Sequence, residues 1–196
     1  MNAPNFWFTS DTHWHHKNII KYCNRPFSDI DEMDEALIKN WNSVVAPQDT
    51  VYHLGDVLFG GESQAGDLFR RLNGIIYFIE GNHDKTMSNF KKVMYRDIFQ
   101  SFENKIHFLG NLKKIALFGQ KIILCHYAMR VWDCCHHGSW NLYGHSHHTL
   151  PDDPNSLSLD VGVDCHNYFP ISFEQIKKIM SKKNFEPIDH HGRQED

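Results

Sequence analysis

Five short polar clusters of this sequence contain histidine or aspartate, and three of them also contain glycine. The clusters are Asp11-Thr12-His13, Gly55-Asp56, Gly81-Asn82-His83-Asp84, Cys125-His126 and Gly144-His145-Ser146-His147. Imidazole nitrogens together with carboxylate or amide oxygens suit Mn, Fe, Zn, Ni or Co. Asp11 and His13 are two positions apart, as are His145 and His147, so in an extended segment each pair points to one side. Each pair could therefore face a metal ion.

Each cluster follows or ends a short apolar run that predicts a β-strand. The predicted strands are Phe6–Thr9, Thr50–Leu54, Ile75–Ile79, Lys114–Phe118, Ile122–Cys125, Leu142–Tyr143 and Leu157–Val161. Apolar residues at helical spacing predict helices from Asp31 to Val45 and from Leu68 to Leu72. A capping box of Ser172 and Gln175 predicts the start of a third helix. Loops at the carboxyl ends of strands in an open sheet converge on one crevice, so the clusters can share a site.

The order of these elements predicts an α/β fold with two packed mixed β-sheets flanked by helices. No internal repeat or linker marks a second domain, so residues 1–183 are expected to form one domain. Residues 184–196 are expected to be a polar tail that frays, with His190 and His191 as tail residues rather than ligands. The glycines before Asp56, Asn82 and His145 predict sharp turns with close backbone approach, which would bring each ligand into the crevice.

The composition excludes some classes of protein. With 196 residues, 41% of them hydrophobic, the chain can bury one sizeable core. A formal net charge of −4 gives no general attraction for nucleic acid, which would have to be held locally. No apolar run approaches the roughly 18 residues of a membrane span, and no secretory signal is recognisable, so we expect a cytoplasmic protein without a membrane partner. The five cysteines show no CxxC spacing and fit reduced thiols.

Taken in order, the five clusters resemble the motifs of the calcineurin-like metallophosphoesterase superfamily, and in particular its small bacterial and phage members. The motifs D-x-H, G-D, G-N-H-D/E, a single H and G-H-x-H are all intact within about residues 5–150. The later stretches Val161–Asp164 and Pro170–Ser172 also resemble the closing strand and helix of such proteins. The resemblance implies the α-β-β-α sandwich of that superfamily.

The resemblance also implies two divalent metal ions, with manganese the expected metal and Fe, Zn, Ni or Co as alternatives. One would be held by Asp11, His13, Asp56 and His147, and the other by Asp56, Asn82, His126 and His145, with Asp56 bridging. Two divalent cations outweigh the two carboxylates of this set, and the surplus positive charge suits a phosphoryl group attacked by a metal-bridging hydroxide. His83 would be the general acid for the leaving group. Asp84 would orient His83, or cap the following helix, or do both.

Three further residues are candidates for substrate binding. They are His16, Arg25 and Arg130, and arginine is the side chain best matched to phosphate oxygens. The alternatives are a surface ion pair for each arginine and a hydrogen-bonded loop position for His16. The segment Trp132–Trp140 is expected to form a loop at the rim, whose aromatic rings either stack on a base or, the preferred interpretation, close a core.

Three functions stay open on the sequence alone. The preferred one is a phosphodiesterase acting on a small molecule, a nucleotide or nucleic acid. A phosphomonoesterase or protein phosphatase is the second, but the loop Gly55–Gly60 lacks the second Asp and the Arg of the G-D-x-x-D-R-G motif of protein phosphatases. A non-catalytic interaction scaffold is the third. The expected partner is a phosphate-ester substrate, and a homo-oligomer is possible.

Overall fold

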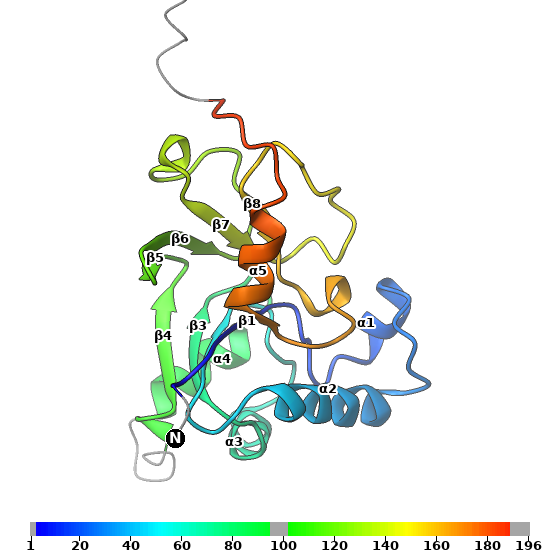
Figure 1. Cartoon of the computed structure of the whole chain (residues 1–196). Helices are drawn as coiled ribbons and strands as arrows, with labels where there is room; N and C mark the ends of the chain where they lie inside the picture. Colours follow the sequence, from blue (N-terminus) through cyan, green and yellow to red (C-terminus); the bar gives the residue numbers. More distant parts are fainter. Residues whose placement is uncertain (1–2, 95–101, 189–196) are drawn as a thin grey trace, which may run out of the picture.

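The structure is a computed structural model that describes residues 3–94 and 102–188, and two β-sheets form its centre (Figure 1). The first sheet has the order β4-β3-β2-β1-β9, with β1 Phe6–Thr9, β2 Thr50–His53, β3 Ile75–Ile79, β4 Ile106–Gly110 and β9 Ile171–Ser172. The first four strands are parallel and β9 is antiparallel. The second sheet has the order β5-β6-β7-β8, with β5 Leu112–Leu117, β6 Gln120–Cys125, β7 Trp140–Tyr143 and β8 Ser158–Asp160. Its β5 and β6 form an antiparallel hairpin, and β6, β7 and β8 are parallel.

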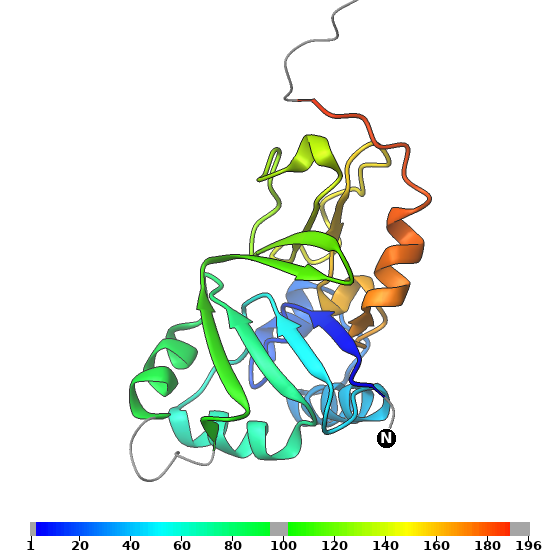
Figure 2. The same ribbon diagram turned by 60° about the vertical axis from the view of Figure 1, so that its left-hand side comes forward.

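Most of the helices lie on one face of the first sheet, and the last helix packs against the core between the two sheets (Figure 2). They are α1 Lys17–Tyr22, α2 Ile30–Val44, α3 Glu62–Arg71, α4 Lys85–Met94 and α5 Phe173–Met180. Asp29 caps α2 by accepting a hydrogen bond from the backbone N–H of Glu32. The capping box of Ser172 and Gln175 is present at the start of α5, as predicted.

Alternation along the strands separates two hydrophobic cores. Val51 and Ile76 face α2, α3 and α4 in one core, whereas Phe8, Leu54 and Ile79 face the second sheet in the other. The second core also takes residues of β6, β7 and α5: Ile122, Leu124, Leu142, Phe173 and Ile176. The two mixed sheets with outer helices confirm the fold class expected from the sequence.

Several predicted boundaries differ from the structure. Leu68 to Arg71 lie in the longer helix α3 and Leu72 caps its end, whereas α1 and β4 were not among the predicted elements. Phe118 was expected in a strand but lies in the turn after β5, with a left-handed φ of 49°. Trp132 and Trp140 are each 6% exposed and belong to the core between the sheets, which supports the packing interpretation of their segment.

The first residues of the expected tail contact the rest of the protein. The backbone N–H groups of Asn184 and Glu186 donate to the carbonyls of Pro154 and Asn155, and Phe185 packs against the core between the sheets; fraying of the tail as a whole stays a prediction. His190 and His191 lie outside the described residues. Within the part of the chain that is described, no helix is both long and apolar enough to cross a bilayer.

Candidate metal centre

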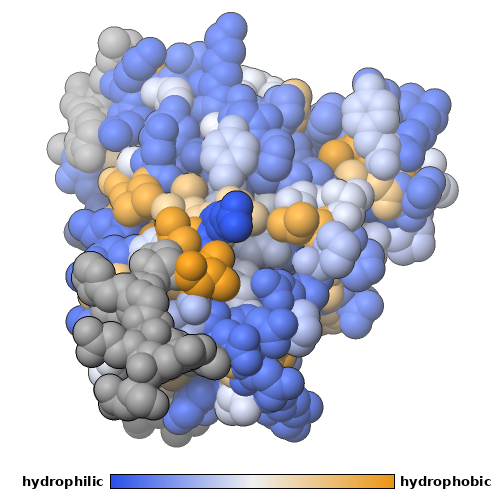
Figure 3. Space-filling model, turned by 90° about the horizontal axis from the view of Figure 1, so that it is seen from above, coloured by the Kyte–Doolittle hydropathy of each residue, from blue (hydrophilic) through white to orange (hydrophobic). Residues whose placement is uncertain are grey.

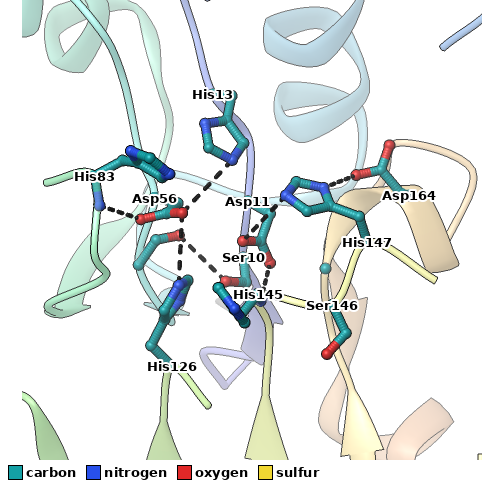
Figure 4. Close-up of polar contacts among 12 residues, drawn as sticks. Ser10, Asp11, His13, Asp56, His83, His126, His145, Ser146, His147 and Asp164 are labelled. Atoms are coloured by element: carbon teal, nitrogen blue, oxygen red, sulfur yellow. Dashed lines mark hydrogen bonds and ion pairs between the residues drawn. The ribbon is translucent and has the colours of Figure 1, made fainter. Parts of the chain in front are cut away.

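Five of the motif segments meet where the strands of the two sheets end (Figure 4). Backbone hydrogen bonds join the first two loops, from Asp11 N to Gly55 O at 3.0 Å and from His13 N to Asp56 O at 3.1 Å. The Asp11 carboxylate accepts from the backbone N–H of His145 at 2.9 Å, which links the first sheet to the second. The convergence predicted for these loops is therefore present.

The potential ligand atoms fall into two groups. We call Asp11, His13 and His147 the first group, and Asp56, His126 and His145 the second group; within each, the ligand atoms lie within 4.8 Å of one another. Asp56 lies between the groups, because its Oδ2 is 3.7 Å from Nε2 of His13 and 3.5 Å from Nε2 of His126. The exposed Asn82 adds a further oxygen, with its Oδ1 3.0 Å from Nε2 of His126.

Unpaired buried atoms show that these residues fit a cation. Oδ1 of Asp11 and both ring nitrogens of His13 are buried and have no hydrogen-bond partner among the described residues. A buried polar atom without a partner costs free energy, and native proteins pair most of them. A cation bound by Oδ1 of Asp11 and one ring nitrogen of His13 would remove most of that cost, and the oxygen and imidazole donors suit the first-row divalent metals.

Two histidines are held so that Nε2 faces the group. Nδ1 of His126 lies 2.7 Å from the carbonyl oxygen of Leu54, and a carbonyl only accepts, so Nδ1 carries the proton. Nδ1 of His147 lies 2.7 Å from Oδ2 of Asp164. A histidine ligand commonly donates its other ring N–H to a carbonyl or carboxylate in this way, which fixes the ring and raises the basicity of the ligating nitrogen.

Four of the potential ligands have pKa values far from those of the free side chains. Burial raises the pKa of Asp11 to about 7, although His147 and His126 oppose the shift. Burial lowers the pKa of His13 to about 2. Burial acts to raise the pKa of Asp56, but hydrogen bonds from His126 and the backbone of His83 outweigh it and bring the value to about 2. For His147 burial acts to lower the pKa, but the hydrogen bond to Asp164 contributes to raising it to about 10.

Asp84 has a different place from the one predicted. Its buried carboxylate accepts from the backbone N–H groups of Asp56, Val57 and Gly81 at 2.8, 2.8 and 2.7 Å. Both oxygens are thus used to join the loops after β2 and β3, and neither is directed at His83. Asp84 directly precedes α4, and the contacts of its carboxylate within the described part of the chain include neither the first turn of α4 nor the ring of His83.

The His83 ring is exposed and lies beside the two groups (Figure 4). Its backbone N–H donates to Oδ1 of Asp56 at 2.8 Å, which fixes its position relative to that carboxylate. The ring centroid is 5.9 Å from that of His13 and 5.6 Å from that of Phe59. Among the described residues, no side chain forms a hydrogen bond with this ring, so it is free to meet a substrate.

The three candidates for substrate binding have different surroundings. His16 is half-buried and stacks on Phe59, with 3.9 Å between the ring centroids. Its ring centroid lies 5.4 Å from that of His13, so His16 borders the first group. Arg130 is exposed and lines a cavity of about 550 Å³ whose walls include none of the ligand residues. Seen from above, the surface of the molecule is mostly hydrophilic, with a hydrophobic area near the middle of this face (Figure 3).

Arg25 is not available to a substrate, contrary to the prediction. It is 4% exposed, and its guanidinium donates to both oxygens of Asp164 and to the carbonyls of Thr12 and Asp11. The surface ion pair considered as the alternative is also wrong, because the pair with Asp164 is buried.

Sequence reasoning missed two supporting residues. Asp164 holds both Arg25 and His147, and it was noted only as part of a closing strand. His53 is fully buried, and its Nε2 lies 2.9 Å from Oγ1 of Thr12, whose hydroxyl donates to the carbonyl of Val57. Neither residue stands in a motif, so only the spatial arrangement reveals it. A thiol also lies near the first group, since Cys23, His147 and Asp164 form a third set of close potential ligand atoms.

A sequence profile of the calcineurin-like phosphoesterase family matches residues 4–191. The chain belongs to this family. This calcineurin-like phosphoesterase is 36% identical to an uncharacterised protein of Methanocaldococcus jannaschii over 189 residues, which cover 93% of this chain and 94% of the relative. It is 41% identical to the Gene 66 protein of Mycobacterium phage L5 over 83 residues, 41% of this chain and 40% of that protein.

A solved structure shares the fold of this calcineurin-like phosphoesterase. A protein of unknown function from Aquifex aeolicus matches 90% of this chain and 100% of its own with a TM-score of 0.65 and 22% sequence identity. At that identity the likeness shows the fold alone. The family match confirms the resemblance inferred from the five motifs and makes the chain a hydrolase of phosphoester bonds that uses divalent metal ions, with phosphate esters as substrates.

Proposed function

We propose that this calcineurin-like phosphoesterase hydrolyses phosphodiesters with two divalent cations. The residues that would hold them are Asp11, His13, Asp56 and His147 for one cation, and Asp56, Asn82, His126 and His145 for the other. The observation that carries the proposal is the position of Asp56 between two groups of converging ligand atoms, beside buried atoms of Asp11 and His13 that lack partners. Mn²⁺ is the proposed metal, and Fe, Zn, Ni or Co, which oxygen and imidazole donors also suit, are the alternatives.

The chain's own residues supply position and a proton. When bound, a pair of cations lowers the pKa of water and stabilises the attacking and leaving oxygens of a displacement. The backbone N–H of His83 donates to Asp56, so the His83 ring is held at a fixed place relative to the proposed bridging carboxylate. The ring has no competing hydrogen bond, and it can donate a proton to the leaving oxygen as general acid. His16 borders the first group and would contact the substrate from that side.

Within residues 3–94 and 102–188, no free arginine is found at the two groups, and this favours a diester. A monoester dianion carries one more charge than a diester and benefits more from a guanidinium. The loop Gly55–Gly60 contains no arginine, and Arg25 has its donors engaged with protein acceptors. We propose that the substrate is a small-molecule, nucleotide or nucleic-acid diester, although the net charge of −4 requires nucleic acid to be held locally.

The direct test compares bis-p-nitrophenyl phosphate with p-nitrophenyl phosphate on Mn²⁺-loaded and chelator-treated protein. We expect a higher kcat/KM for the diester and loss of both activities after chelation. A higher kcat/KM for the monoester would replace the diesterase proposal with a monoesterase.

His83→Ala tests the proton donor. We expect the variant to keep both cations and to lose about 10²–10⁴-fold in kcat on a diester that releases an alcohol or nucleoside. The loss should be smaller for a nitrophenyl ester, because nitrophenolate leaves without much protonation. Metal content by atomic absorption and the two kcat ratios are the measurements. Equal losses for both leaving groups, or loss of one cation, would assign His83 another role.

A further inference from the structure

We propose that Arg25 and Asp164 are positioning residues that selectively set the affinity of the first group for its cation. They do so by holding the Nε2 of His147 and the backbone of the Asp11–His13 loop in one arrangement. This inference rests on the proposed cation pair, and it adds two residues that lie outside the five motifs.

Arg25 and Asp164 form a forked ion pair across 139 positions of sequence. Nε of Arg25 donates to Oδ1 of Asp164 at 2.8 Å, and one terminal nitrogen donates to Oδ2 at 2.9 Å. The side chain of Arg25 is 0% exposed and that of Asp164 is 5% exposed. The planar guanidinium matches a carboxylate through two parallel hydrogen bonds, and a lysine cannot reproduce this geometry.

The remaining contacts of each partner reach the first group. Oδ2 of Asp164 accepts from Nδ1 of His147 at 2.7 Å, which leaves Nε2 of His147 facing Asp11, 3.9 Å from Oδ1 of that residue. The terminal nitrogens of Arg25 donate to the carbonyls of Thr12 at 2.9 Å and Asp11 at 2.7 Å. One guanidinium thus ties the loop that carries Asp11 to the carboxylate that orients His147.

Two residues of the second group have orienting contacts outside this pair. His126 is oriented by the carbonyl of Leu54, and the backbone of Asp56 is held by the carboxylate of Asp84. Removing the fork should therefore release His147 while His126 keeps its orientation. Asp164 also occupies Nδ1 of His147, and these two residues form the third set of potential ligands together with Cys23. The pair thereby directs Nε2, rather than Nδ1, to a cation.

The test is calorimetric titration of Mn²⁺ into chelator-treated protein, which measures binding without turnover. His13→Ala identifies the binding step of the first group, and His126→Ala identifies the step of the second. We expect Arg25→Lys, Arg25→Met and Asp164→Asn to weaken the first-group step by about 10–100-fold and to leave the second step within about twofold, as second-shell changes at metal sites do. In the double variant Arg25→Met/Asp164→Asn, the affinity of the first-group step should fall no further than in the single variant that binds Mn²⁺ less tightly, because the two residues act as one unit.

Arg71→Lys is the matched control. Arg71 also forms two hydrogen bonds with one carboxylate, that of Glu35, at 2.7 and 2.6 Å through its two terminal nitrogens, but this pair is at the surface and contains no ligand residue. We expect unchanged binding in this variant. Equal weakening of both steps by Asp164→Asn, or an unchanged first step, would overturn the inference. A single step in the wild-type protein would contradict the proposed cation pair, whereas weakening of that step by Arg25→Lys would still support the positioning role.

Discussion

At the scale of single residues, two of the proposed ligands, Asp11 and His147, have raised pKa values, so a metal ion that binds them would displace protons. Burial raises the pKa of Asp11 to about 7, and the pKa of His147 is raised to about 10 despite its burial, with Asp164 as the main hydrogen-bond partner. A metal binds carboxylate and neutral imidazole only, so binding releases protons from groups whose cation-free pKa lies above the working pH. Asp164, which orients His147, thus also contributes to making metal binding sensitive to pH.

We predict that Mn²⁺ affinity rises between about pH 6 and pH 8, by up to tenfold per pH unit for each proton displaced. The sign follows because both groups have raised pKa values, so their protonated and non-binding forms predominate at the lower pH. Calorimetry at pH 6.5 in two buffers of different ionisation enthalpy counts the released protons. Uptake of Mn²⁺ without proton release at that pH would contradict the prediction.

At the scale of elements, the loops after the strands approach so closely that glycine is required. A Cβ on Gly81 would collide with the Oδ1 and the backbone nitrogen of Asp56, and a Cβ on Gly144 would collide with the side chains of Ser10 and Asp11. The parallel strands bring these loops together, and the missing side chains let their backbones pack. The close approach predicted at these glycines is therefore present.

Gly81→Ala should displace the Asp56 carboxylate and remove at least one cation, with a loss of diester hydrolysis of at least about 100-fold. Gly61→Ala is the control, because Gly61 has an ordinary φ and its nearest contact to an added Cβ is the flexible end of Gln64 at 4.0 Å. Metal content and kcat/KM of both variants decide the question. Wild-type metal content in Gly81→Ala would show that the loop can yield without moving Asp56.

The sequence could predict the strands and the ligand clusters because each cluster is short and directly follows an apolar run. Ile75–Ile79 and Phe6–Thr9 were placed at their observed bounds for that reason. It could not predict the role of Arg25, whose partner Asp164 is 139 positions away. The contacts of Asp84 could not be predicted for the same reason, because its carboxylate accepts hydrogen bonds from backbone N–H groups of another loop. Partners chosen by tertiary contact leave no local pattern.

At the scale of the whole molecule, a buried lysine connects the segment directly after α5 to the second sheet. The side chain of Lys183 is 4% exposed, and its amino group donates to Asp152 Oδ1 and to the carbonyls of Asp153 and Ser158. This contact joins the segment after α5 to the loop before β8. It lies apart from both ligand groups, so stability and metal binding should respond to it independently.

Lys183→Met should lower the free energy of unfolding by about 1–3 kcal/mol, because carbonyls at this site lose their donor. Mn²⁺ affinity should stay at the wild-type value. Urea unfolding monitored by circular dichroism measures the first quantity and calorimetry the second. The prediction fails if stability is unchanged, or if Mn²⁺ affinity falls in the folded variant.

Five of the proposed ligands have left-handed backbones, with φ values of 57° at Asp11, 52° at His13, 56° at Asp56, 67° at His145 and 44° at His147. Such a conformation costs roughly 1–2 kcal/mol per residue outside glycine. Cations that bind only this arrangement would oppose its relaxation. Chelation should consequently speed amide hydrogen exchange in the loops after β1, β2 and β7, while exchange in the strands stays slow. The bound metal ions would thus limit the motion of the ligand loops and hold them in their left-handed backbone conformations.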